Sequence, residues 1–110
     1  MAGPQREKNE LRTTILKALA NLTRICIMEK LREGPHSVTE LSARVQSDIS
    51  TVSKHLSILK SAGLIEDQKD GTSVYYSLTT DSILDILASI DVVIRRNYEQ
   101  YRDFFKKDVG

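Results

Sequence analysis

The stretch SDISTVSKHLSILKSAGLI (residues 47–65) has the spacing of a single helix with two different faces. Val52, Leu56 and Leu59 share one side of that helix, which predicts a buried apolar stripe. The opposite side carries only small hydroxyls and one lysine, namely Ser50, Lys54, Ser57 and Ser61. Small hydroxyls allow close approach to another surface, and they bond to phosphates and base edges. A helix that only faces solvent would more often carry Glu, Lys or Arg, so the stretch favours a recognition helix over a solvated face.

The signals around this helix place a second, shorter helix directly before it. Ser37 to Glu40 form a capping box, which predicts a helix from Ser37 to about Arg44. Residues 45–47 then form a short turn, and Asp48 is a good N-cap for the helix over 49–62. Gly63 supplies a C-cap where φ turns positive. Two short helices joined by a three-residue turn are typical of a helix-turn-helix.

The rest of the chain follows from periodicity and from turn residues. We expect a loose start over residues 1–6, two strands joined by an Asp70-Gly71 turn, and three further helices. The helices are predicted at about 7–19, 22–32 and 80–105, and the strands at 64–69 and 73–78.

The predicted fold class is therefore mainly α with a small β-hairpin, a winged helix-turn-helix in the order α-α-α-α-β-β-α. A single domain over residues 1–110 would hold the helix-turn-helix at 37–62, the wing at 64–78 and a long last helix at 80–105.

Composition limits which classes of protein this chain can belong to. The chain has 110 residues and a formal net charge of only +1, which suits one modest globular domain and does not by itself indicate nucleic acid. Its single cysteine excludes an internal disulfide and fits a reducing compartment. No segment has the pattern of a signal peptide or a transmembrane helix. We therefore expect a cytoplasmic protein.

Three motifs carry a resemblance to a known family. They are S-T-V-S-x-H-L at residues 50–56, L-x-x-A-G-L-I at 59–65 and G-x-x-V-Y-Y-x-L at 71–78. Over residues 11–80 the chain resembles the ArsR/SmtB family of winged-helix transcriptional repressors. The resemblance implies a homodimer joined mainly by the first and last helices. Each subunit would place the helix at 49–62 in a major groove of double-stranded operator DNA, with the wing on the flanking backbone or minor groove.

The last helix supports a dimer without reference to any family. It carries a longer apolar stripe than a domain of this size can cover, and its end adds Tyr98, Tyr101, Phe104 and Phe105. The alternative is that the stripe packs only on its own subunit.

The candidate DNA-binding residues lie on the predicted recognition helix and beside it. Those expected to contact bases or phosphates are Ser50, Thr51, Ser53, Lys54 and His55. His55 either braces the helix or touches DNA, in preference to binding a metal. Arg44 and Lys69 are expected to contact the DNA backbone.

The usual metal sites of the family are missing from this sequence. Ser37 and Thr39 stand where the family has a cysteine pair, and the last helix holds carboxylates but no histidine. Hydroxyls are poor ligands for soft metals, so we expect no metal site and no cofactor. Cys26 is the only thiol, either a passive side chain or a redox-reactive switch. No nucleophile–base pair or phosphate loop points to an enzyme.

The charge distribution is also compatible with a second function. Residues 37–78 hold four Lys or Arg against five Asp or Glu, a net charge of −1, whereas residues 1–36 hold seven against four, a net charge of +3. Phosphate neutralisation drives DNA affinity, so Arg6, Lys8 and Arg12 are expected to help from the flank. The alternative is a winged-helix module whose acidic wing contacts a protein and which has little DNA affinity. The sequence specifies neither the operator nor an effector.

Overall fold

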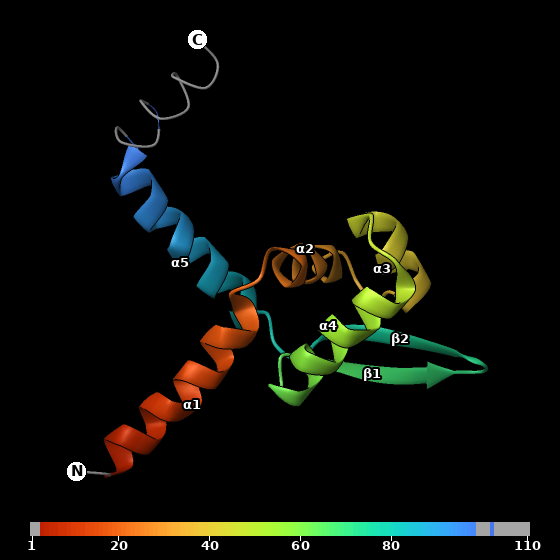
Figure 1. Ribbon diagram of the computed structural model, residues 1–110, viewed down its shortest axis with the longest axis horizontal. Helices are drawn as coiled ribbons and strands as arrows, with labels where there is room; N and C mark the ends of the chain where they lie inside the picture. Colours follow the sequence, from red (N-terminus) through yellow and green to blue (C-terminus); the bar gives the residue numbers. More distant parts are fainter. Residues whose placement is uncertain (1–2, 99–101, 103–110) are drawn as a thin grey trace.

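The described part of the chain contains five helices and one hairpin, in the predicted order (Figure 1). The structure is a computed structural model, and it describes residues 3–98 and residue 102. The elements are α1 (Pro4–Leu19), α2 (Leu22–Leu31), α3 (Val38–Val45), α4 (Ile49–Ser61), β1 (Ile65–Asp70), β2 (Ser73–Leu78) and α5 (Ser82–Arg96). The expected winged helix-turn-helix is thus confirmed.

The hydrophobic core lies where α2, α3 and α4 meet above the start of the wing. Ile27 and Met28 of α2 and Leu41 of α3 are fully buried there. From α4 the core receives the predicted stripe, Val52, Leu56 and Leu59, which is confirmed as buried. Because α4 is held by this one face, its opposite face is left at the surface.

The predicted caps fix where α3 and α4 begin. The Ser37 hydroxyl accepts from the Glu40 backbone N–H at 3.2 Å, and the Glu40 carboxylate accepts from the Ser37 N–H at 2.9 Å, which confirms the capping box. Asp48 caps α4 by accepting from the Thr51 N–H at 2.7 Å. Gln46, in the turn between the two helices, has a φ of 56°, in the left-handed region that favours glycine.

The wing is an antiparallel hairpin whose register runs from Ile65 opposite Leu78 to Asp70 opposite Ser73. The turn is therefore formed by Gly71 and Thr72, and its predicted placement at Asp70-Gly71 was wrong by one residue. A two-residue loop that begins with glycine needs a positive φ at that position, and Gly71 has a φ of 65°. The aspartate stays in the strand because the ladder extends one pair further than expected.

His36 extends this small sheet in a way that the sequence did not suggest. Its backbone N–H donates to the Tyr76 carbonyl at 3.0 Å, and its carbonyl accepts from the Tyr76 N–H at 2.8 Å. The side chain is buried and its Nδ1 lies 2.7 Å from the Gly34 carbonyl oxygen. The segment before α3 therefore links the helix-turn-helix to β2 through a backbone bridge.

Two helix ends differ from the prediction. α1 begins at Pro4, not at Glu7, so residues 4–6 are not a loose start. Proline suits the first helical position because its fixed φ is helical and because the N–H that it lacks would have no partner there. α5 begins at Ser82 and is continuous to Arg96. Of the residues expected to extend it to 105, positions 99–101 and 103–105 lie outside the described residues.

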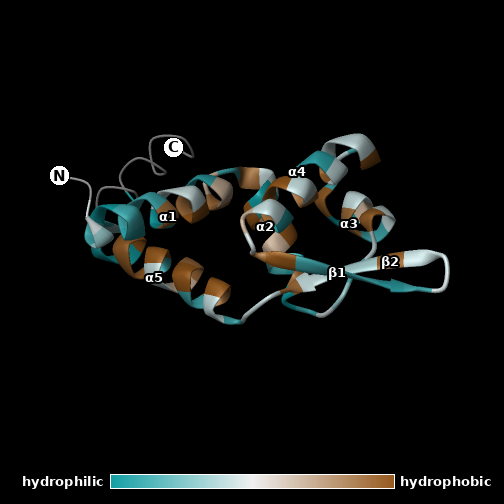
Figure 2. Cartoon of the chain, turned by 90° about the horizontal axis from the view of Figure 1, so that it is seen from below, coloured by the Kyte–Doolittle hydropathy of each residue, from teal (hydrophilic) through white to brown (hydrophobic). Residues whose placement is uncertain are grey.

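Helices α1 and α5 leave the body on the same side as two diverging arms (Figure 1). Apolar residues run along α5 in Figure 2, and several of them are exposed: Ile90, Val92, Val93 and Ile94. Only Ile83, at the start of α5, is buried in the described part of this helix. Most of the α5 stripe thus lacks a cover within its own subunit. None of the described helices is both long and apolar enough to cross a membrane.

Candidate nucleic-acid interface

The outward face of α4 has the predicted composition. The exposed residues there are Ser50, Ser53, Lys54, Ser57 and Ser61, and Thr51 is half-buried at their edge. Five of these six side chains are short hydroxyls, so the helix surface is low and rich in hydrogen-bonding groups. Such a surface can approach base edges and phosphates closely.

Asp48 organises the start of this face. Its carboxylate accepts from the Thr51 N–H at 2.7 Å and from the Ser50 hydroxyl at 2.9 Å. The hydrogen bonds from Thr51, followed by that from Ser50, hold the pKa of Asp48 below its ordinary value. The cap is therefore charged at neutral pH, and it fixes the Ser50 hydroxyl in position. Ser50 keeps its acceptor capacity for an outside donor.

His55 faces the interior side of α4 more than the outward face. It is half-buried, and its Nδ1 lies 3.2 Å from Nη1 of Arg24 in α2. Burial, and then the charge of Arg24, lower the pKa of His55. The neutral imidazole accepts the Arg24 hydrogen bond at Nδ1, which leaves the N–H on Nε2. This geometry matches the bracing alternative for His55.

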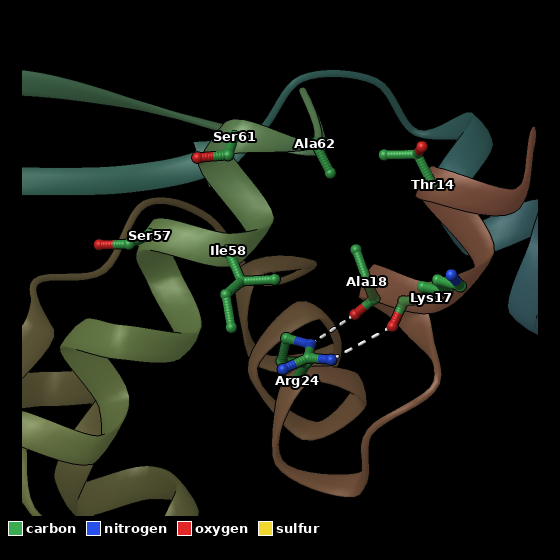
Figure 3. Close-up of a pocket in the computed structure, with 8 residues that line it drawn as sticks. All are labelled: Thr14, Lys17, Ala18, Arg24, Ser57, Ile58, Ser61 and Ala62. Atoms are coloured by element: carbon green, nitrogen blue, oxygen red, sulfur yellow. Dashed lines mark hydrogen bonds between the residues drawn. The ribbon is translucent and has the colours of Figure 1, made fainter. Parts of the chain in front are cut away.

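Arg24 is the residue that the sequence reasoning missed. Besides His55, its guanidinium donates through Nε to the Ala18 carbonyl at 2.6 Å and through Nη2 to the Lys17 carbonyl at 3.2 Å, as Figure 3 shows. The Arg24 side chain, in α2, therefore hydrogen-bonds both to carbonyls in the last turn of α1 and to His55 of α4. His55 lies 31 positions further along the chain, and no local spacing signal predicts such a contact.

The cations beside α4 are only partly free. Arg44 donates through Nη2 to both carboxylate oxygens of Glu33, at 2.8 and 3.1 Å, and this hydrogen bond lowers the pKa of Glu33. Lys60 of α4 pairs with Asp67 of β1 at 3.0 Å. The expected DNA-backbone role of Arg44 would require it to share or leave Glu33. The pair is exposed, so separating it costs little.

Lys54 and Lys69 are exposed and form no ion pair with another described residue. Of the three flanking cations on α1, Arg6 pairs with Glu10 at 3.3 Å and Arg12 donates to Asn9 at 3.0 Å. Lys8 is exposed and unpaired among the described residues. Lys8, Arg12, Lys54 and Lys69 are therefore the candidate DNA-binding cations that can contact phosphates without breaking an ion pair to a described residue.

The positions considered for metal and redox chemistry are Ser37, at the start of α3, and Cys26, in α2. Ser37, which replaces a family cysteine, caps α3, and within residues 3–98 and 102 no three His, Cys, Asp or Glu side chains cluster to hold a metal ion. Cys26 is half-buried in α2 as a free thiol. Its redox role stays a prediction.

Comparison with known proteins gives the family. The sequence pattern described as "Bacterial regulatory protein, arsR family" matches residues 21–67, from the cap of α2 into β1. The HTH-type transcriptional regulator MJ1325 of Methanocaldococcus jannaschii is 34% identical over 86 residues, which cover 77% of this chain and 97% of that one. The chain belongs to the ArsR family. The family resemblance drawn from the three motifs is thereby confirmed.

Other ArsR-type relatives are regulators as well. The transcriptional activator HlyU of Vibrio cholerae is 36% identical over 78 residues, 70% of this chain and 72% of HlyU. The HTH-type regulator Rv0324 of Mycobacterium tuberculosis is 32% identical over 96 residues, but the chain spans only 42% of its length. A solved structure of the homodimeric winged helix-turn-helix DNA-binding domain Mb0332 of Mycobacterium bovis matches 91% of this chain and 95% of that one, at 29% identity and a TM-score of 0.77.

Proposed function

We propose that this ArsR-family protein is a homodimer that binds operator DNA with α4 in the major groove and represses transcription. One observation carries the proposal: α4 buries Val52, Leu56 and Leu59 and turns a low, hydroxyl-rich face outward beside the wing. Side chains of that kind contact DNA without holding the helix away from the base edges. The homodimeric DNA-binding domain of Mb0332 supports the assembly.

The residues divide by the part of DNA that they would meet. Ser50, Thr51 and Ser53 lie in the first turns of α4, so they would contact base edges, as recognition helices do with their N-terminal residues. Lys54 and Lys69 would neutralise phosphates, and Arg44 would do so after leaving Glu33. His55, held against Arg24, would set the angle at which α4 enters the groove.

Repression follows from geometry if the operator overlaps a promoter, because a dimer that covers two half-sites would exclude the polymerase. HlyU, by its name, is an activator, so the direction of control is a property of each family member. A reporter gene driven by the upstream region of this gene should gain expression when the protein is removed. Loss of expression would instead indicate activation.

The acidic wing favours a second function. Glu66, Asp67 and Asp70 are exposed, and only Lys60 pairs with one of them among the described residues. A wing of this charge repels phosphates and could dock on a basic protein surface instead.

A pair of matched lysine variants separates the two functions. Lys54→Gln removes an exposed cation from the outward face of α4, whereas Lys30→Gln removes a half-buried cation from α2, outside the proposed interface. If α4 reads DNA, Lys54→Gln should weaken binding by about fivefold and reduce the salt dependence by about one ion, with Lys30→Gln close to wild type. Equal affinities for all three proteins would contradict the DNA-reading role of α4.

A further inference from the structure

A crevice of about 490 Å³ lies between the end of α1 and the second half of α4 (Figure 3). It is in the size range of pockets that hold small organic molecules. Ser57 and Ser61 of the outward α4 face line one side of the crevice, whereas Ser50, Thr51, Ser53 and Lys54, the α4 residues proposed to contact DNA, do not. The crevice adjoins both α1 and α4, the helix proposed to read DNA.

The walls of the crevice are largely apolar. Ala18 of α1, with Ile58 and Ala62 at the end of α4, point into the space in Figure 3. Ile58 is 44% exposed, so part of its aliphatic side chain is open to a ligand. An apolar ligand body of one or two rings would cover these side chains and gain from the area that it removes from water.

The charge around the crevice has one sign. Lys17 and Arg24 contribute to the lining, and no acidic side chain does. Arg24 uses three of its five N–H groups on the Ala18 and Lys17 carbonyls and on His55, which leaves two for another acceptor. Lys17 forms no ion pair with a described residue. Two uncompensated cations beside apolar walls are complementary to an anion with an apolar body.

We propose that this crevice binds a small organic carboxylate with an aromatic or similarly compact apolar body. The carboxylate lies at the Lys17 and Arg24 side, and the ring system lies against Ile58 and Ala62. Carboxylates accept well from guanidinium and ammonium donors, which fixes the orientation of the ligand. The hydroxyl of Thr14 also lines the crevice, but it donates to the Glu10 carbonyl at 3.2 Å, so Lys17 and Arg24 are the donors left for the ligand.

The same crevice is connected to DNA binding through Arg24. This side chain joins the α1 carbonyls to His55, so a carboxylate that draws the guanidinium toward itself changes how α4 is held against α1. A ligand alters DNA affinity only to the extent that it binds the two arrangements differently. We assign the ligand to the arrangement with lower DNA affinity, because it also neutralises cations beside α4. This regulatory step rests on the proposed function, whereas binding to the crevice does not.

The direct test is calorimetric titration of the full-length protein with 2-naphthoate and with its neutral analogue 2-naphthamide, without DNA. We expect one naphthoate per subunit with a dissociation constant below about 1 mM, and at least about tenfold weaker binding of the amide. Lys17→Gln should weaken naphthoate binding by about threefold, as for an exposed ion pair. Lys8→Gln, the same change on the same helix but away from the crevice, should leave it unchanged.

A filling variant locates the ligand. Ala62→Leu extends a side chain into the crevice and should abolish naphthoate binding, while circular dichroism reports whether the variant is folded. If Ala62→Leu is unfolded, the comparison of Lys17→Gln with Lys8→Gln still tests whether naphthoate binds in the crevice. Absence of naphthoate binding, equal binding of acid and amide, or full binding by a folded Ala62→Leu variant would each overturn the proposal.

The regulatory step has its own readout. Naphthoate, but not naphthamide, should weaken operator binding by wild-type protein, and Ala62→Leu should not respond. Binding without any effect on operator affinity would leave the site standing and overturn its regulatory role. If the protein binds no DNA selectively, the proposed function is wrong. The calorimetric titration still tests the crevice, because it is done without DNA.

Discussion

Arg24 and His55 form the contact through which α1, α2 and α4 are joined. The Arg24 guanidinium reaches two carbonyls at the end of α1 and the Nδ1 atom of His55, all within 3.2 Å. His55 can accept this hydrogen bond only while it is neutral, because a protonated imidazole has no free lone pair. The contact therefore depends on a group that titrates near neutral pH.

This dependence gives a pH prediction. The pKa of His55 in the folded protein lies below the ordinary value of 6.5, so the folded state binds fewer protons than the unfolded state around that pH. The free energy of unfolding should then fall as the pH drops below about 6.5 toward the folded pKa. In urea titrations between about pH 7.5 and 5.5, His55→Gln should lose part of this fall, because glutamine accepts the hydrogen bond without titrating.

Other lowered pKa values do not interfere in that window. Glu33, Glu40 and Asp48 are held below their ordinary values of 4.5, 4.5 and 3.8, and their contributions are lost only as the pH falls through still lower values. Identical pH profiles for wild type and His55→Gln would show that His55 is not the group responsible.

Gln46 carries the least favourable backbone conformation of the helix-turn-helix. Its φ of 56° places an L-residue in the left-handed region, which costs about 1–2 kcal/mol, while glycine there loses about 0.5–1 kcal/mol in unfolded-chain entropy. Gln46→Gly should therefore raise the free energy of unfolding by about 0.5 kcal/mol. Gln46→Ala keeps the strain and should not stabilise the protein. A denaturation midpoint for Gln46→Gly below that of wild type would contradict this explanation.

At the scale of single elements, the capping box sets the start of α3. Ser37→Ala removes the hydroxyl that accepts from the Glu40 N–H and should lower the free energy of unfolding by about 1 kcal/mol, whereas Ser37→Gly should cost only a few tenths of that. Chemical denaturation of both variants measures the difference. If Ser37→Ala had wild-type stability, Ser37 would not be acting as a cap.

The elements were predictable where local chemistry decides them. The buried stripe of α4, the caps at Ser37 and Asp48 and the wing strands all follow from periodicity and from short-range hydrogen bonds. Errors arose where one residue fits more than one role. Pro4 fits a first helical turn as well as a loose start, and Asp70 fits a strand end as well as a turn.

The site was less predictable, because its key contacts join distant parts of the chain. The face of α4 could be read from helical spacing alone. The pairing of Arg44 with Glu33, the bridge between His36 and Tyr76 and the Arg24 contact to His55 could not. Each depends on tertiary packing, which places side chains together irrespective of their spacing in sequence.

At the scale of the whole molecule, α5 indicates how two subunits would meet. Ile90 and Ile94 continue the line of the buried Ile83 along one side of α5, and they are 46% and 45% exposed. Val92 lies on the opposite side and is also exposed. The continuous stripe, and not the isolated valine, is the surface that a partner would cover.

A pair of glutamate variants tests this surface. Ile94→Glu would bury a charge in the proposed interface, and it should weaken dimerisation by about a hundredfold or more. Val92→Glu adds the same charge on the other side of the helix and should leave the dimer intact. Sedimentation velocity over a range of concentrations distinguishes the two. Dimer dissociation in Val92→Glu alone would place the interface on the other side of α5.

The central claim is that the dimer reads DNA with α4. Its most direct test is fluorescence anisotropy of the protein on DNA from its own upstream region and on scrambled DNA of the same composition, at about 50 and 200 mM salt. We expect at least about a hundredfold preference for the upstream DNA and a clear loss of affinity at the higher salt. Equal, weak binding to both DNAs at low salt would contradict the claim and would favour a protein partner for the acidic wing.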